Sequence, residues 1–222
     1  LDLDLEKPTA DSTQAPALGW DEFLDALRRG MVQVDNDTDL VCIGEMGIGN
    51  TTVSAALAHA LYGGAAQDWT GRGTGVGDAS LARKAQAVAN GRSRHAAILN
   101  DPLEIARCLG GRELAAMAGA ALAARRARIP LLIDGYVASA ALAPLHVAAP
   151  GFLEHCWAAH VSAEPGHLRL LQRMGLSPLL DLGMRLGEAS GAATAIPLLR
   201  AALATHAGMA SFADAGVAEK SD

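Results

Sequence analysis

Two short segments, far apart in the sequence, place acidic residues among glycines and other small residues. The first runs from Gly44 to Thr52 with the sequence GEMGIGNTT, and the second runs from Met184 to Ala192 with the sequence MRLGEASGA. Glycines let backbone N–H groups approach an anion closely, and the start of a following helix adds positive potential. Asn50 and Thr51 add hydrogen-bond donors. An anion-binding loop and an ordinary, capped strand-to-helix turn both fit the first segment.

Neither segment matches the common nucleotide-binding motifs. A P-loop needs a Lys-Ser/Thr pair, which is absent, and the GxGxxG dinucleotide pattern does not fit in register. Glu188, in the second segment, is surrounded by small and apolar residues and precedes a predicted helix. Such a carboxylate is either a favourable charge at a helix start or a base held in a partly dry pocket. The residues alone leave both roles open.

Three further features could bind a ligand. The segment GRGTGVGD, from Gly71 to Asp78, has a glycine at every second place and is either a ligand loop, through Gly73 and Gly75, or a plain linker. Lys84 lies about one and a half turns into the next predicted helix. It is solvated if it faces outward, and a phosphate ligand if it faces the strand ends. Ser162, after a weak strand, offers another donor.

The sequence lacks the usual patterns for metals and disulfides. The seven histidines form no HExxH pair, and Cys42, Cys108 and Cys156 are odd in number and widely spaced. We therefore expect no metal and no other cofactor. Reduced thiols are typical of a cytoplasmic protein, which is the location that we expect.

Composition narrows the class of protein. The chain has 222 residues, half of them hydrophobic, which suffices for one core and a small second lobe. The formal net charge of −6 argues against a broad basic surface for nucleic acid. Gly, Arg, His and Pro interrupt every long apolar run, so we expect no membrane span. We expect small-molecule partners instead.

Strands and helices alternate along most of the chain. The patterns predict strands over 1–6, 40–43, 129–133 and 156–161, and helices over 20–31, 51–62, from 78, from 102, over 112–127, from 136, over 168–174 and over 188–205, the last interrupted at Pro197. This alternation is typical of an α/β fold: a three-layer, Rossmann-like parallel sheet with helices on both faces. Ligands in such folds gather at the carboxyl ends of strands. We divide the chain into an N-terminal strand and connection (1–18), an α/β nucleotide-binding domain (19–185) and a C-terminal active-site loop with helices (186–222).

Taken together, the motifs resemble the nicotinate-nucleotide–dimethylbenzimidazole phosphoribosyltransferase family. GEMGIGNTT, GRGTGVGD followed by LARK, LIDGYVASAAL, HVSAE and MRLGEASGAA occur in the order that the family shows, most strongly from Val41 to Pro197. The resemblance implies transfer of a phosphoribosyl group from nicotinate mononucleotide to 5,6-dimethylbenzimidazole, in making the lower ligand of cobalamin. It also implies a homodimer. Family members carry a substantial segment before the residues that match Leu1, so we expect a small helical lobe that is incomplete in this chain and that residues 186–222 join.

The resemblance also assigns roles to residues. It makes Glu188 the catalytic base and places Glu45 in the same active site. It makes Met46 and Leu186 part of the pocket for the aromatic base. It makes Gly47, Lys84 and Ser162 ligands of the phosphate and ribose, and the two glycine-rich loops complete this set with Asn50, Thr51, Gly73 and Gly75.

Two other functions fit the same residues. The chain could be a truncated, nonenzymatic nucleotide-binding homologue that kept the loops but lost part of the base pocket. It could also be a phosphoribosyltransferase for another azole or a purine, because the size of the base pocket does not follow from the sequence.

Overall fold

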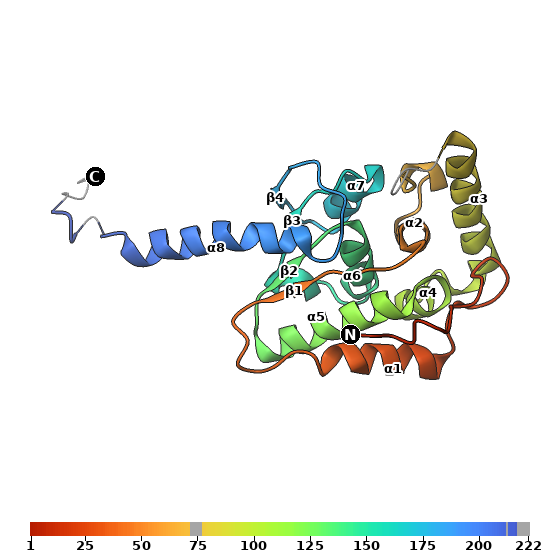
Figure 1. Cartoon of the computed structure of the whole chain (residues 1–222), viewed down its shortest axis with the longest axis horizontal. Helices are drawn as coiled ribbons and strands as arrows, with labels where there is room; N and C mark the ends of the chain where they lie inside the picture. Colours follow the sequence, from red (N-terminus) through yellow and green to blue (C-terminus); the bar gives the residue numbers. More distant parts are fainter. Residues whose placement is uncertain (72–76, 212, 217–222) are drawn as a thin grey trace.

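Four short parallel strands form the centre of the molecule, and their order in the sheet follows their order in the chain (Figure 1). The computed structural model describes residues 1–71, 77–211 and 213–216. Val41 pairs with Leu131, Leu131 with Cys156, and Ala158 with Pro178. The α/β fold with a parallel sheet, predicted from the sequence, is confirmed.

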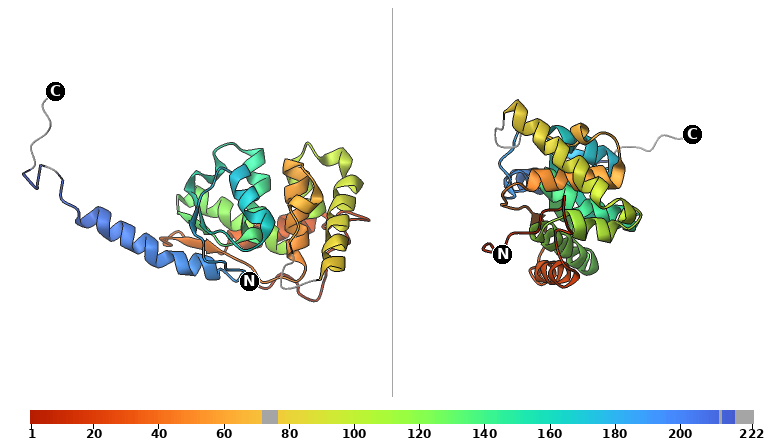
Figure 2. Two further views of the ribbon diagram at one scale, coloured as in Figure 1. Left: turned by 90° about the horizontal axis from the view of Figure 1, so that it is seen from above. Right: turned by 90° about the vertical axis from the view of Figure 1, so that its right-hand side faces the viewer.

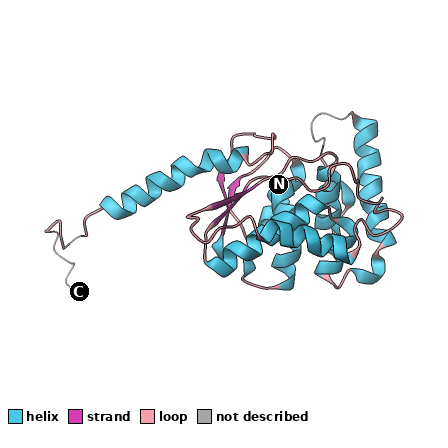
Figure 3. Ribbon diagram, turned by 60° about the horizontal axis from the view of Figure 1, so that its bottom comes forward, coloured by secondary structure: helices cyan, strands magenta, loops and turns pink. Residues whose placement is uncertain are grey.

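Helices make up most of the rest of the described chain, as Figure 3 shows by colour. The elements in chain order are α1 (Trp20–Met31), β1 (Val41–Ile43), α2 (Asn50–Tyr62), η1 (Ala66–Asp68), α3 (Asp78–Arg94), η2 (Ala96–Ile98), α4 (Pro102–Leu109), α5 (Arg112–Ala127), β2 (Leu131–Ile133), α6 (Tyr136–Ala148), η3 (Phe152–His155), β3 (Cys156–His160), α7 (Pro165–Arg173), β4 (Pro178–Leu180) and α8 (Ser190–Gly208).

The two faces of the sheet are covered unequally. Connections between parallel strands are right-handed, so strands that follow one another in order place their connecting helices on one face. Leu131 and Ile133 pack on that face with residues of α2, α4, α5, α6 and α7. Leu132 points to the opposite face, where it packs with Ala192 and Ala195 of α8. Helix α8 follows the last strand, and it extends well beyond the sheet (Figure 2).

Small residues allow close packing between α1 and α5. A Cβ at Gly30 of α1 would lie 1.8 Å from the carbonyl oxygen of Ala116, and one at Gly119 of α5 would lie 1.9 Å from that of Leu27. Only glycine leaves room for the two backbones at these points. The alanine- and glycine-rich composition therefore serves helix packing as well as ligand loops.

The predicted strand over 1–6 is wrong. These residues form a turn in which Asp4 has a φ of +62° and the Lys7 N–H donates to the Asp4 carbonyl oxygen. Arg29 of α1 holds the turn by pairing with the Asp4 carboxylate at 3.0 Å. Asp2 and Asp4 thus contact helix α1 through Arg29, whereas Leu1 and Leu5 are exposed, and residues 1–18 contain no strand.

Three other predictions need correction near the end of the chain. Helix α8 is continuous through Pro197, and it begins at Ser190, because Glu188 and Ala189 have left-handed backbones. Helix α7 begins three residues earlier than predicted, with Pro165 in its first turn. Strand β4 was not predicted, because three residues beginning with proline carry almost no strand pattern.

Within the described ranges, no helix combines the length and the apolar character needed to cross a bilayer.

Candidate active site at the carboxyl edge of the sheet

A cavity of about 360 Å³ lies where the strands end. Segments that follow all four strands contribute to its wall. The lining residues are Gly44 to Thr51 after β1, Asp134 to Ala138 after β2, His160, Ser162 and Glu164 at and after β3, and Arg185 to Glu188 between β4 and α8. A site at this edge of the sheet was predicted from the sequence, and the cavity lies there.

The two acidic segments meet at this cavity. The Glu188 N–H donates to the carbonyl oxygen of Glu45 at 3.0 Å. A Cβ at Gly44 would lie 2.2 Å from the backbone nitrogen of Ala189, so only glycine permits this approach. The contact brings together two motifs that are widely separated in the sequence.

The turn that carries Glu188 has an unusual backbone. Gly187, Glu188 and Ala189 have φ values of +87°, +56° and +57°. Residues other than glycine rarely adopt this left-handed conformation, and it costs about 1–3 kcal/mol each. Such strain is concentrated at functional sites. This turn holds the exposed Glu188 side chain at the rim of the cavity.

Glu45 has the electrostatic surroundings of a base that works near neutral pH. Burial raises the pKa of its carboxyl to about 7, against the lowering effect of a hydrogen bond from Asn50, and the nearby charges of Glu113 and Asp134 add to the rise. The Asn50 side-chain N–H donates to Oε2 of Glu45. Burial also raises the pKa of Glu113. A pKa near 7 suits a group that must accept and release protons in turnover.

Apolar side chains project from both loops. Met46 is 82% exposed and Leu186 is 72% exposed, and both line the cavity. Ile48, which the sequence analysis did not single out, is fully exposed beside them. Large exposed apolar side chains at a cavity rim are typical of a site for an aromatic ligand.

Four of the residues expected to bind the phosphate and ribose line the cavity. Gly47, Asn50, Thr51 and Ser162 line it directly. Lys84 does not line it, but its Nζ donates to Oγ1 of Thr51 at 2.8 Å and to the Gly71 carbonyl oxygen at 3.0 Å.

Two points concern the other residues expected to bind the phosphate. Burial lowers the pKa of Lys84, and the charge of Glu164 opposes the effect. Gly73 and Gly75 fall outside the described residues.

Sequence reasoning missed several residues of the cavity wall. Asp134 is almost fully buried, and its Oδ1 accepts the Ala192 N–H at 2.9 Å and lies 3.6 Å from Nε2 of His160. A Cβ at Gly191 would lie 2.0 Å from His160, so glycine lets α8 approach that ring. The Asp-Gly pair at the end of a predicted strand was the available signal.

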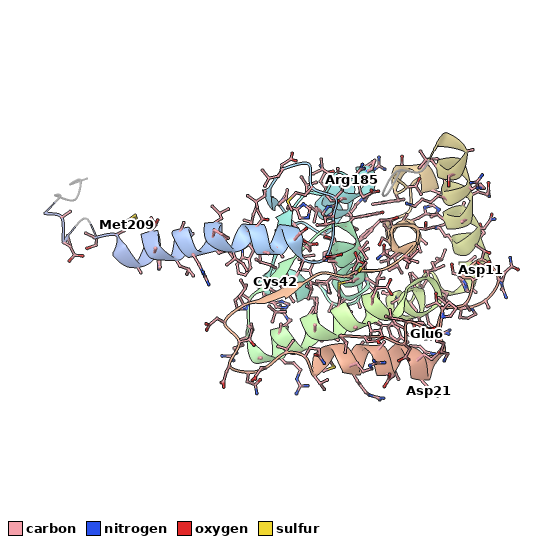
Figure 4. All side chains as sticks on the ribbon, in the orientation of Figure 1. Glu6, Asp11, Asp21, Cys42, Arg185 and Met209 are labelled. Atoms are coloured by element: carbon pink, nitrogen blue, oxygen red, sulfur yellow. The ribbon has the colours of Figure 1, made fainter. Side chains whose placement is uncertain are left out.

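A second charged pair also lies on the cavity wall. Arg185, labelled in Figure 4, lies on the loop between β4 and α8, with its Nη2 3.9 Å from Oε1 of the buried Glu164. Oε2 of Glu164 has no hydrogen-bond partner among the described residues. This oxygen is itself buried, and a Cβ at Gly71 would lie 2.2 Å from it. No group of three or more metal-binding side chains occurs in the part of the chain that the structure describes.

Comparison with known proteins places these features in one family. The chain matches the family described as "Phosphoribosyltransferase" over residues 1–217. The chain belongs to this phosphoribosyltransferase family. The family assignment confirms the resemblance that the sequence motifs indicated.

Individual members of the phosphoribosyltransferase family are closely similar in sequence to this chain. Two curated relatives carry the name nicotinate-nucleotide–dimethylbenzimidazole phosphoribosyltransferase. The protein from Mesorhizobium japonicum is 60% identical over 220 residues, which are 99% of this chain and 66% of the relative. The protein from Ruegeria pomeroyi is 57% identical over 98% of this chain and 64% of its own length. The chain thus spans about two thirds of the length of these relatives.

Solved structures agree with the family assignment. The crystal structure of CobT from Thermus thermophilus superposes with a TM-score of 0.88 at 44% identity, over 96% of this chain and 64% of that one. A second structure, titled as the nicotinate-nucleotide–dimethylbenzimidazole phosphoribosyltransferase of the same organism, gives a TM-score of 0.86 at 42% identity.

Proposed function

We propose that the protein is a glycosyltransferase that moves the phosphoribosyl group of nicotinate mononucleotide onto 5,6-dimethylbenzimidazole, giving α-ribazole 5′-phosphate and nicotinate. The observation that carries this proposal is the meeting of the Glu45 and Glu188 loops, each with an apolar neighbour, around one cavity. The names of the curated relatives support the same reaction.

The proposed chemistry needs few catalytic groups. The ring nitrogen of nicotinate mononucleotide is quaternary, so the electron pair of its bond to C1′ returns to the ring and nicotinate leaves without a general acid. One nitrogen of the benzimidazole forms the new bond to C1′. Its other nitrogen carries an N–H, and that proton must be lost for a neutral product. One carboxylate beside this N–H can accept the proton and orient the ring.

Two carboxylates are available for that proton. We propose Glu188 as the base, as the family resemblance implies, and Glu45 as its neighbour on the joined loop. The pKa of about 7 for Glu45 lets it hold either a proton or a charge at neutral pH, so it can hydrogen-bond the ring in both states. Met46 and Leu186 would pack on the ring faces.

The phosphate and ribose would lie on the side of the cavity that Gly47, Asn50, Thr51 and Ser162 line. The first turn of α2 supplies N–H groups there, and Lys84 supports Thr51. Holding the phosphate fixes C1′ against the attacking nitrogen, which lowers the entropy cost of the displacement. Gly73 and Gly75 remain candidates for the same role.

The test is direct. Full-length protein is incubated with nicotinate mononucleotide and dimethylbenzimidazole, and α-ribazole 5′-phosphate is detected by mass spectrometry. Product with dimethylbenzimidazole supports the proposal. Product only with another azole or a purine would favour the broader phosphoribosyltransferase, and nucleotide binding without any product would favour the nonenzymatic homologue.

Three matched variants assign the base. Removing general-base assistance typically costs about 100- to 10,000-fold in rate. We expect Glu188→Gln to lower turnover on that scale with little change in nucleotide binding. Glu45→Gln should be less damaging, and Glu154→Gln, on an exposed side chain outside the cavity, should match wild type. A larger loss for Glu45→Gln than for Glu188→Gln would move the role of base to Glu45.

We further propose that the protein acts in the cytoplasm as a homodimer. Three thiols without disulfide bonds support the compartment, and the family resemblance supports the dimer. Light scattering of the full-length protein during size-exclusion chromatography tests the oligomeric state.

A further inference from the structure

His167, in the first turn of α7, is completely buried and has hydrogen-bond partners on both ring nitrogens. Nδ1 lies 2.8 Å from the backbone nitrogen of Ser162. Nε2 lies 3.0 Å from Oγ of Ser139 on α6. The ring therefore bridges the loop after β3 and helix α6.

The partners fix the protonation of this ring. A backbone N–H can only donate, so Nδ1 of His167 must be the acceptor. Nε2 then carries the ring hydrogen and donates to the Ser139 hydroxyl. Burial lowers the pKa of His167 to about 3, with His160 as a smaller cause, so the ring is neutral. A buried neutral imidazole with one tautomer forms a fixed hydrogen-bonded bridge and does not act as an acid or base at pH 7.

Both bridged elements form walls of the cavity. Ser162 lines it directly, as do Tyr136 to Ala138 in the first turn of α6. The Tyr136 hydroxyl donates to the Trp69 carbonyl oxygen at 2.8 Å, and its ring centroid lies 6.0 Å from that of His167. The His167 ring therefore holds the Ser162 loop at a fixed position relative to α6.

The arrangement also directs the Ser162 hydroxyl. Its Oγ lies 3.0 Å from Nδ1 of His167. Nδ1 has one lone pair, and the Ser162 N–H occupies it at the shorter distance. Because Nδ1 already accepts the Ser162 N–H, an anionic group in the cavity would be the better acceptor for the hydroxyl hydrogen.

We propose that His167 is a positioning residue for the transfer reaction: its neutral ring holds the Ser162 backbone so that the Ser162 hydroxyl donates to the phosphoribosyl group. The proposal rests on the proposed function, because it needs a phosphorylated nucleotide in this cavity. His167 itself touches no substrate.

A pair of substitutions separates positioning from packing. In His167→Asn the side-chain oxygen takes the place of Nδ1 and keeps an acceptor for the Ser162 N–H. In His167→Gln the polar group lies near the position of Nε2, so the Ser162 N–H loses its partner. We expect His167→Gln to raise KM for nicotinate mononucleotide about 10-fold or more and to leave KM for the base within about twofold, and His167→Asn to stay within about threefold of wild type for both.

Two controls test the route of the effect. His155→Gln removes a half-buried histidine, which contacts the carbonyl oxygens of Phe152 and Ala121 away from the cavity. It should lower the melting temperature without changing KM. On a Ser162→Ala background, His167→Gln should add less than about twofold, because its effect runs through Ser162.

Several results would overturn the proposal. Equal changes for His167→Asn and His167→Gln, or a lower melting temperature with no change in KM, would make His167 a packing residue only. ¹⁵N NMR of the imidazole at pH 7 gives a readout that needs no activity: protonation on Nε2 supports the arrangement, and protonation on Nδ1 refutes it. Wild-type protein that forms no product would instead refute the proposed function, whatever the tautomer.

Discussion

The raised pKa of Glu45 predicts a specific dependence of stability on pH. The folded protein holds the Glu45 proton with a pKa of about 7, against 4.5 for an ordinary glutamate. The folded state therefore binds this proton more tightly than the unfolded state. The resulting stability is fully present below pH 4.5 and is lost as the pH rises through about 7.

The size of this effect follows from the shift. A difference of about 2.5 pK units corresponds to a ceiling of about 3 kcal/mol. Glu45 is only partly buried and lines an open cavity, so solvent screening reduces the expected value to about 1–2 kcal/mol. Glu45→Gln mimics the protonated carboxyl and can still accept the hydrogen bond from Asn50. The variant should lack this loss of stability.

Urea unfolding of both proteins from pH 5 to pH 9 measures the difference. We expect the free energy of unfolding of wild type to fall by about 1–2 kcal/mol relative to Glu45→Gln between pH 5 and pH 8. Other titrating groups are shared by both proteins and cancel. Parallel curves across this range would show that Glu45 is not desolvated and would refute the reasoning.

Glu22 provides a control of opposite sign. Hydrogen bonds from Lys7 and from the Gly19 backbone lower the pKa of its carboxyl to about 2. Its contribution is present above pH 4.5 and is lost as the pH falls toward 2. The difference between wild type and Glu22→Gln should therefore stay constant from pH 5 to pH 9.

Three further predictions concern stability, each measured by urea unfolding. Gly30→Ala forces a Cβ against the α5 backbone and should cost about 1–3 kcal/mol, whereas Gly208→Ala, which meets open space, should gain up to about 0.5 kcal/mol; equal effects would contradict the close packing. Asp101→Ala removes the side chain that accepts two N–H groups at the start of α4, for a loss of about 1 kcal/mol that Asp101→Asn should largely avoid. Asp134→Ala leaves the Ala192 N–H without its partner, for about 1–3 kcal/mol, and unchanged hydrogen exchange at Ala192 would refute this role.

Local patterns predicted most of the elements. The helix α5 runs over Arg112–Ala127 as its composition indicated, and the cap at Asp101 is where the Asp-Pro pair placed it. The wrong strand over residues 1–6 has a physical cause outside the local pattern. The turn at residues 1–7 is set by Arg29, a tertiary contact that no local pattern contains.

In the candidate site, too, local patterns identified residues but not the tertiary contacts between them. The sequence placed Glu45 and Glu188 in motifs, but their hydrogen-bonded contact depends on how the sheet orders its strands. Asp134 was visible only as the end of a strand, since its bond to Ala192 joins distant parts of the chain. His167 had no sequence signal at all, because its role lies in two hydrogen bonds to separate elements.

The late position of α8 in the chain has a consequence for synthesis. The helices that cover one face of the sheet all precede β4, so that layer can assemble while the protein is still emerging from the ribosome. The opposite face, with Leu132 and Ala159, lacks the cover that α8 provides until α8 is made. The same event brings Glu188 to Glu45 by closing a long loop, which is slow because of its entropy cost. Until α8 is made, the nascent chain therefore lacks both the α8 cover of this apolar face and the contact that completes the site, and exposed apolar surface in such an intermediate favours aggregation.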